Sequence, residues 1–197
     1  KRKSMLSYKE SLKILKETDA LLEGHFVLSS GLHSDKYVQC AKLLSKPAKA
    51  RELCLSLAEK IKKEYKNIDL ILSPAIGGIV IGYEIGKILN TETIFAERVN
   101  NNFNLRRGFE IKKEQKILIV EDVITTGKSS LECSSLAKKL GAEIVGYACI
   151  IDRSNGKSQI DKTIVSQVQI EIPTYNKENL PKHLQNIKAV KPGSRDL

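Results

Sequence analysis

The chain has 197 residues, a formal net charge of +10 and a hydrophobic fraction of 41%, which is enough for one substantial domain spanning residues 1–197. No apolar run reaches the length of a membrane span and no signal-peptide pattern precedes the first predicted helix, so we expect a cytoplasmic protein without a membrane partner. The four cysteines are widely spaced and form no CxxC pair, which argues against a zinc site and fits thiols in a reducing compartment.

The positive charge alone could indicate a nucleic-acid partner. The lysines, however, are spread over predicted helices that also carry acids, as in Lys9–Lys16 and Lys60–Lys66, and no basic stripe with interleaved aromatics occurs. We therefore expect solvated helix faces and no nucleic acid. A polyanionic substrate would also suit a basic enzyme.

The first half of the chain carries five segments with the periodicity or end signals of regular structure. They are a helix at 7–22, a hairpin at 26–40, a helix at 47–65, a strand at 69–72 and a helix at 79–89. Ser7 and Glu10 have the spacing of a capping box at the start of the first helix, and Gly24 marks its predicted end. The hairpin is expected to turn at Ser30-Gly31.

The second half continues the alternation of strands and helices. Its predicted segments are a strand at 93–96, a polar loop at 99–108, a strand at 117–120, a helix that ends near 140 and a strand at 144–151. This alternation predicts an α/β fold, in which a parallel sheet has helices on both faces and ligands bind at the carboxyl ends of the strands. Residues 1 to about 40 and the C-terminal tail are expected to form a small hood subdomain over the sheet.

The segment Ile117–Leu131, ILIVEDVITTGKSSL, is the most informative part of the sequence. Its first four residues are typical of a strand buried on both faces, and Glu121 and Asp122 are predicted to follow at the strand end. Small and hydroxylated residues then lead into a helix, whose free N–H groups and dipole favour a phosphate. The two carboxylates suit sugar hydroxyls or a metal-bound water. Together these features predict a phosphorylated sugar as the ligand.

This segment has two other interpretations. Gly127-Lys128-Ser129 has the ending of a P-loop, but Asp122 stands where the P-loop needs its first glycine, and a carboxylate there would repel the phosphates. The other interpretation is purely structural: an acidic strand end followed by an ordinary capped helix that binds no ligand. The concentration of acidic, hydroxylated and glycine residues disfavours it.

With these residues in view, the segment resembles the phosphoribosyl-pyrophosphate (PRPP) signature of the type I phosphoribosyltransferases. Four more segments, in the same order, are similar to the members of that family that use orotate. They are 28–37 (LSSGLHSDKY), 73–79 (SPAIGGI), 95–109 (FAERVNNNFNLRRGF) and 151–153 (IDR). The resemblance therefore covers nearly the whole chain.

The resemblance implies the type I phosphoribosyltransferase fold, with the hood over the base site. It implies transfer of the 5-phosphoribosyl group from PRPP to orotate, which gives orotidine 5′-monophosphate and pyrophosphate in pyrimidine synthesis. No protein nucleophile is required. Mg²⁺ is expected as the cofactor, held mainly by PRPP and water and not directly by the protein. A homodimer is also implied.

The same resemblance assigns roles to individual residues. Those expected to bind PRPP are Gly77, Gly78, Arg98, Glu121, Asp122, Val123, Ile124, Thr125, Thr126, Gly127, Lys128 and Ser129. Those expected to act in catalysis are Glu121, Asp122, Arg98 and Arg106. Those expected to bind orotate are Ser30, Gly31, Tyr37, Thr125 and Arg153. The family often has a non-proline cis peptide in the loop at 73–79.

The residues themselves support parts of this assignment. Gly77-Gly78 lies between a predicted strand and helix, where glycines let backbone amides approach a phosphate, although a plain glycine turn is the alternative. Arg98 and Arg106 flank a polar loop that could close over pyrophosphate, the alternative being an exposed hairpin with solvated charges. The guanidinium of Arg153 suits a carboxylate, although a surface ion pair with Asp152 is possible on sequence alone.

The chain also departs from the commonest family pattern. Lysines are usual where Ser29 and Gly77 stand, and lysines and a histidine are usual in the loop that here holds three asparagines. Arg106 and Arg107 are our hypothetical replacements for that charge. His33 is interpreted as a surface loop histidine.

Three alternatives to an orotate enzyme stay open. One is a purine or uracil phosphoribosyltransferase, which Arg153 and the segment Leu28–Tyr37 disfavour. Another is a regulator that keeps the fold and binds RNA through its basic surface. The third is a sugar-phosphate-binding subunit that is active only with a partner.

Overall fold

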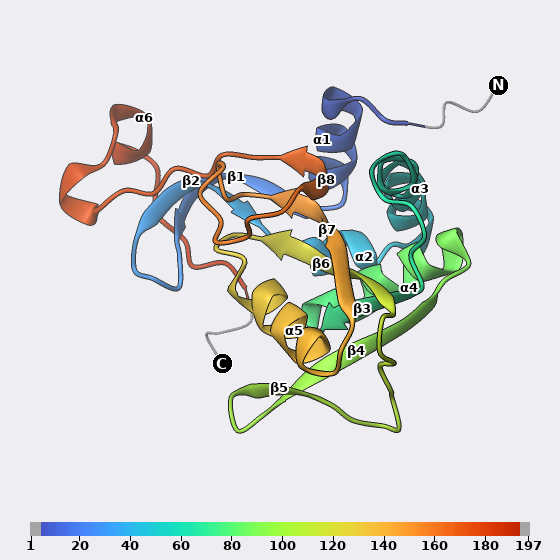
Figure 1. The fold of residues 1–197 in the computed structure, drawn as a ribbon. Coiled ribbons are helices and arrows are strands. Elements are labelled where there is room, and N and C mark those ends of the chain that lie inside the picture. Colours follow the sequence, from blue (N-terminus) through green and yellow to red (C-terminus); the bar gives the residue numbers. More distant parts are fainter. Residues whose placement is uncertain (1–4, 194–197) are drawn as a thin grey trace.

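The structure, a computed structural model, describes residues 5–193 and centres on a six-stranded sheet (Figure 1). The strands lie in the order β5-β4-β3-β6-β7-β8. Their bounds are β3 (Leu70–Pro74), β4 (Glu92–Val99), β5 (Asn102–Leu105), β6 (Lys116–Ile124), β7 (Glu143–Asp152) and β8 (Ile164–Gln169). All pairs are parallel except β4 with β5 at one edge, so the predicted parallel sheet is confirmed.

Helices cover both faces of this sheet (Figure 1). Their bounds are α1 (Tyr8–Glu17), α2 (Cys40–Leu44), α3 (Pro47–Glu64), α4 (Gly77–Leu89), α5 (Lys128–Lys139), α6 (Lys182–Gln185) and the 3₁₀ helix η1 (Lys177–Asn179). Successive residues of a strand point to opposite faces. Leu118 accordingly packs in the core with α1, α3 and α4, whereas Ile117 and Ile119 pack with α5. Both faces of β6 are therefore buried, which explains its continuous apolar run.

The N-terminal hairpin forms a separate two-stranded sheet that the C-terminal tail joins. β1 (Leu21–Val27) and β2 (His33–Val38) are antiparallel, and the predicted turn at Ser30-Gly31 is confirmed. Isolated bridges link Phe26 to Val190 and His33 to Tyr175. Figure 1 shows this unit at the left, on the side toward which β6 points. Its role as a hood over a base site stays a prediction.

Two predictions in this region were wrong. The first helix ends at Glu17, because Asp19 takes a left-handed conformation (φ 59°) after the C-cap Thr18, and Leu21 begins a strand that contains Gly24. His33 is buried, with an exposed fraction of 7%. Its Nδ1 lies 2.6 Å from Nε2 of His25, whose Nδ1 lies 2.7 Å from the carbonyl of Ile187. The pair thus joins the hairpin to the tail.

Two strands were not predicted from the sequence, and a third is longer than expected. The segment 99–108, expected as a polar loop, contains β5, which pairs with the end of β4 so that Arg98 lies opposite Phe103. β6 extends to Ile124, so Glu121 and Asp122 lie within the strand and not after its end. β8 was not predicted.

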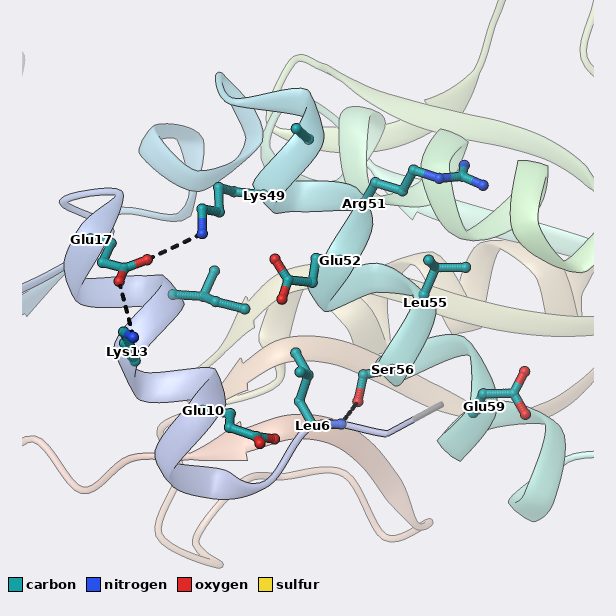
Figure 2. Close-up of a pocket in the computed structure, with 12 residues that line it drawn as sticks. Leu6, Glu10, Lys13, Glu17, Lys49, Arg51, Glu52, Leu55, Ser56 and Glu59 are labelled. Carbon is teal, nitrogen blue, oxygen red and sulfur yellow. Dashed lines mark hydrogen bonds and ion pairs between the residues drawn. The ribbon is translucent and has the colours of Figure 1, made fainter. Parts of the chain in front are cut away.

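A cavity of about 830 Å³ lies between α1 and α3, away from β6 (Figure 2). Its apolar lining includes Leu6, Ile14 and Leu55. Figure 2 shows Glu17 at its edge, paired with both Lys13 and Lys49. In the described part of the chain, no helix is long and apolar enough to cross a membrane.

Candidate active site

Two adjacent carboxylates on β6 face opposite sides of the sheet. Glu121 Oε2 accepts a hydrogen bond of 2.9 Å from the Ser130 hydroxyl on α5. Asp122 Oδ1 accepts one of 2.8 Å from the backbone N–H of Val123, and its carboxylate lies beside Gly77 at the start of α4. This alternation is what a strand imposes on neighbouring side chains. One carboxylate is therefore oriented by α5 and the other meets the loop before α4.

Both carboxylates have raised pKa values because they are largely buried. Burial raises the pKa of Glu121 to about 7; the Ser130 hydrogen bond opposes this rise, the charge of Asp122 adds to it and Arg98 opposes it. Burial also raises the pKa of Asp122, opposed by hydrogen bonds from the N–H groups of Val123 and of Asp122 itself. Perturbed carboxylates at the carboxyl end of a central strand mark a candidate site.

The loop between β3 and α4 approaches these carboxylates closely. A Cβ atom placed on Gly77 would lie 3.0 Å from both carboxylate oxygens of Asp122. One placed on Gly78 would lie 3.0 Å from Cβ of Ser73 and 3.2 Å from the carbonyl oxygen of Val120. Glycine at these two positions thus permits a close approach that a larger residue would crowd. The cis peptide that the resemblance implied is present, between Ala75 and Ile76.

The loop between β6 and α5 forms an open helix N-terminus, as predicted. Thr125 and Thr126 are exposed, and Gly127 adopts a left-handed conformation (φ 84°) as the N-cap of α5. The Thr126 carbonyl accepts a 2.8 Å hydrogen bond from the Gln159 N–H, and its hydroxyl accepts one from the N–H of Lys128. No acidic residue occupies the first turn of α5. The dipole of α5 therefore favours an anion at this N-terminus, although the N–H of Lys128 already donates to Thr126.

The three loop arginines all contact carboxylates. Nη1 of Arg98 lies 2.7 Å from Oε2 of Glu132 on α5, and the guanidinium stacks 4.1 Å from the ring centre of Phe103. Arg107 donates two hydrogen bonds to Glu97, while Nη1 of Arg106 lies 3.9 Å from the same residue. Of these three arginines, only Arg98 is among the groups that shift the pKa of Glu121. The exposed-hairpin geometry is thus what the structure describes, with Arg98 nearest the carboxylates.

Arg153 lies beside the loop that begins with Thr125. It follows β7, and its N–H donates a 2.9 Å hydrogen bond to the Ile124 carbonyl. The side chain is half-buried, and burial lowers the pKa of its guanidinium. Within residues 5–193 the Arg153 guanidinium makes no ion pair. The Asp152 carboxylate accepts a hydrogen bond from the Ser154 N–H instead. The surface ion pair with Asp152 is therefore not formed, and Arg153 keeps its donors for another partner.

In the part of the chain that the structure describes, the hairpin residues that were expected to bind the orotate base form no hydrogen bonds with the other residues of the candidate site. Ser30 and Gly31 lie in the exposed turn, and the ring of Tyr37 is 6.0 Å from that of Phe26. Across residues 5–193, no hydrogen bond or ion pair joins these three residues to Arg153 or Thr125. The structure thus brings together the β3–α4 loop, the β6 carboxylates, the β6–α5 loop and Arg153. Within the described chain, the hairpin residues are not bonded to this group.

Sequence reasoning missed two residues that hold this arrangement. Ser130 is fully buried and orients Glu121, although the sequence suggested only a hydroxyl near a helix start. Glu132 pairs with Arg98 across 34 positions of sequence. Its spacing of four from Lys128 was the one local signal, and it gave no hint of Arg98.

Comparisons with known proteins find similar sequences over most of the chain. The family model for the phosphoribosyl transferase domain matches residues 42–186. An orotate phosphoribosyltransferase of Parvibaculum lavamentivorans is 46% identical over 189 residues, which cover 94% of this chain and 97% of that protein. One of Carboxydothermus hydrogenoformans is 44% identical over 183 residues, covering 93% and 96%.

Solved structures share the fold at lower sequence identity. The orotate phosphoribosyltransferase of Aeropyrum pernix has a TM-score of 0.67 at 22% identity, covering 80% of this chain and 92% of that one. The adenine phosphoribosyltransferase of Thermoanaerobacter pseudethanolicus has a TM-score of 0.57 at 17% identity, covering 68% and 88%. At these identities the likeness concerns the fold, which enzymes for different bases share.

Proposed function

The chain belongs to the phosphoribosyltransferase family, and from this premise we propose that it is an orotate phosphoribosyltransferase. It transfers the 5-phosphoribosyl group of PRPP to orotate and releases pyrophosphate, a step of pyrimidine synthesis. The observation that carries the proposal is the pair Glu121-Asp122 beside the open N-terminus of α5, because this pair offers ribose and phosphate sites side by side. We place the enzyme in the cytoplasm.

PRPP would lie across the carboxyl ends of β3 and β6. Glu121 and Asp122 accept hydrogen bonds from the ribose hydroxyls, while the loop from Val123 to Ser129 surrounds the 5′-phosphate with N–H and hydroxyl groups. The backbone at Gly77-Gly78 and the side chains of Arg98 and Arg106 receive the pyrophosphate. The close approach of Gly77 to Asp122 supports this layout, because it sets the pyrophosphate loop against the ribose site.

The reaction needs orientation and charge stabilisation and no protein nucleophile. The C1′–oxygen bond to pyrophosphate breaks with both electrons leaving on the pyrophosphate. A ring nitrogen of orotate forms the new bond to C1′ and releases its N–H proton to solvent. Positive charge develops on the ribose as the bond stretches, and the carboxylates of Glu121 and Asp122 stabilise it. Arg98 and the amides before α4 stabilise the leaving group. Holding both substrates in line supplies the rest of the rate.

Mg²⁺ is the proposed cofactor, and it supplies charge neutralisation of the pyrophosphate. This ion commonly binds one or two carboxylates, substrate phosphates and several waters. Glu121 and Asp122 are hard oxygen acceptors beside the proposed pyrophosphate loop, so they fit a site in which they would hold metal-bound waters and not the ion directly. Among the described residues, no group of three or more His, Cys, Asp or Glu is arranged to hold a metal. PRPP and water would therefore provide most of its ligands.

Orotate would bind between the phosphate loop and the hairpin. Arg153 receives the orotate carboxylate, which the half-buried and unpaired guanidinium supports. Thr125 assists from the adjacent loop. Ser30, Gly31 and Tyr37 close the site from the hairpin, with Tyr37 stacking on the base. This last placement requires the hairpin turn to approach Arg153.

A homodimer is the proposed assembly. Three large apolar side chains project from the outer surface of α4 and the residue before it, with exposed fractions of 85% for Ile76, 52% for Val80 and 66% for Tyr83. Their spacing places Ile76, Val80 and Tyr83 on one helix face. A second copy of the chain would bury this stripe, which adjoins the pyrophosphate loop.

The experiment that tests the proposal is a base panel. The purified chain is incubated with Mg²⁺, PRPP and either orotate, uracil, adenine or hypoxanthine, and products are separated by chromatography. We expect a product with orotate and with none of the other three bases. We also expect the Arg153→Ala variant to form no product with orotate. Product with another base in preference to orotate would support the purine or uracil alternative. Absence of any product together with salt-dependent binding of RNA would support the regulator.

A further inference from the structure

Glu132 is not among the residues proposed to contact a substrate, yet its carboxylate holds Arg98, which is proposed to bind pyrophosphate. Oε2 of Glu132 lies 2.7 Å from Nη1 of Arg98, and the same nitrogen donates to the Asn101 carbonyl at 2.8 Å. The guanidinium also stacks on Phe103. Three elements, α5, the β4–β5 turn and β5, therefore fix one face and one end of Arg98. Its other donors are free to meet an anion.

The ion pair stands close to the ribose carboxylates. The charge of Arg98 lowers the pKa of Glu121, whereas the charge of Asp122 raises it. The pKa of the Cys133 thiol responds to the same groups: burial raises it to about 12, with Glu121 and Glu132 adding to the rise and Arg98 opposing it. The charges of Glu121, Glu132 and Arg98 thus all act on one buried thiol of α5. The hydrogen bond to Glu132 joins Arg98 to α5, the helix that also orients Glu121 through Ser130.

Glu132 also contacts a second cation of the proposed PRPP site. Its Oε1 lies 4.0 Å from Nζ of Lys128, four positions earlier on α5. Lys128 and Glu132 both line a cavity of about 770 Å³ between β5 and α5, together with Phe103. One carboxylate therefore lies between two cations that would otherwise repel each other. Opposite charge at this distance favours their staying close before an anionic ligand arrives.

We propose that Glu132 is a positioning residue, which holds the Arg98 guanidinium in the orientation that receives the pyrophosphate group. The proposal rests on the proposed function, because it takes Arg98 as the pyrophosphate ligand. Glu132 itself touches no reacting atom. Its effect on binding must therefore pass through Arg98, and this dependence separates it from a general effect of negative charge or of folding.

The test is calorimetric binding of pyrophosphate with Mg²⁺ to the full chain, for wild type, Glu132→Gln, Glu132→Asp, Arg98→Ala and the double variant Arg98→Ala/Glu132→Gln. Glu143→Gln is the matched control, because Glu143 is exposed at the opposite end of the sheet, where β7 begins. We expect Glu132→Gln to weaken binding roughly tenfold, about the value of one charge-assisted hydrogen bond. Glu132→Asp should weaken it less, and the control should match wild type.

The double-mutant cycle decides between positioning and other roles. In the Arg98→Ala background, Glu132→Gln should change the Kd less than about twofold. Equal or tighter binding by Glu132→Gln alone, full additivity of the two variants, or no pyrophosphate binding by wild type would overturn the proposal. Orotate consumption by wild type is measured separately, so failure of the proposed function is distinguished from failure of the positioning role.

Discussion

The side chain of Asp122 lies against Gly77 at the start of α4. A substitution of this carboxylate is therefore expected to affect the proposed site directly. We predict that Asp122→Asn lowers turnover about 100-fold or more, because the amide loses the charge that stabilises the developing ribose cation. The measurement is steady-state turnover of PRPP and orotate. Glu92→Gln is the control, since Glu92 lies at the amino end of β4. Turnover within a few-fold of wild type for both variants would remove Asp122 from the reaction.

Glu121 titrates near neutrality, and this has a consequence for activity. In the proposed site its ionised form would accept hydrogen bonds from ribose, so kcat/KM for PRPP should rise with pH through about 7. Ser130→Ala removes a hydrogen bond that favours the ionised form and should shift the rise to higher pH. Superimposable pH profiles for wild type and Ser130→Ala would contradict this account of the Glu121 carboxylate.

The same shift affects stability with a definite sign. The folded-state pKa of Glu121 is raised from 4.5 to about 7, so the folded protein binds the proton more tightly than the unfolded chain does. This contribution is fully present below pH 4.5 and is lost as pH rises toward 7. We predict that Glu121→Gln gains stability relative to wild type as pH rises through this interval. Thermal unfolding of the substrate-free chain at several pH values measures it.

Among the connecting elements, the β6–α5 loop depends on the glycine that caps α5. Gly127 has φ 84°, and an added Cβ would lie 2.8 Å from Cγ1 of Ile160, whereas Gly108 has φ 73° and open space around it. We predict that Gly108→Ala costs about 1 kcal/mol of unfolding free energy and Gly127→Ala at least about 2 kcal/mol. Denaturant titration of both variants isolates the Ile160 contact. Equal losses would show that the backbone conformation alone sets the cost.

The elements that the sequence predicted well are those whose own residues dictate them. The apolar run of β6, the capping box at Ser7 and the glycine start of α5 all act within one turn or one strand. The β1 strand was mistaken for helix because Leu21 and Leu22 suit both, and the decisive feature is the left-handed Asp19. β5 was missed because its pairing with β4 is a tertiary choice that its polar asparagines do not signal.

The candidate site divides in the same way. The chain order of Glu121, Asp122 and Gly127 already indicates a sugar-phosphate ligand, because neighbours in sequence build that part of the site. Contacts across the fold are different: the approach of Gly77 to Asp122 and the pairing of Arg98 with Glu132 arise from packing between distant segments. Periodicity and spacing carry no information on such pairs.

For the molecule as a whole, the apolar stripe on α4 leads to a prediction about assembly. Val80→Glu combined with Tyr83→Glu should convert a dimer to a monomer, because buried charges oppose association. Light scattering after size exclusion measures the mass. Tyr8→Glu is the control, since Tyr8 has a similar exposed fraction, 56%, but lies on α1. A monomeric wild type, or a dimer that survives the paired substitution, would contradict an interface at this stripe.

The measurement that tests the central claim most directly is a spectrophotometric assay of orotate. The purified chain, Mg²⁺, PRPP and orotate are mixed and the orotate absorbance is followed, with each component omitted in turn. We predict a loss that requires all four components and that fails in Asp122→Asn combined with Arg98→Ala. Undiminished orotate absorbance with the complete mixture, while PRPP binding is demonstrated, would contradict the assignment to orotate and leave only the sugar-phosphate site.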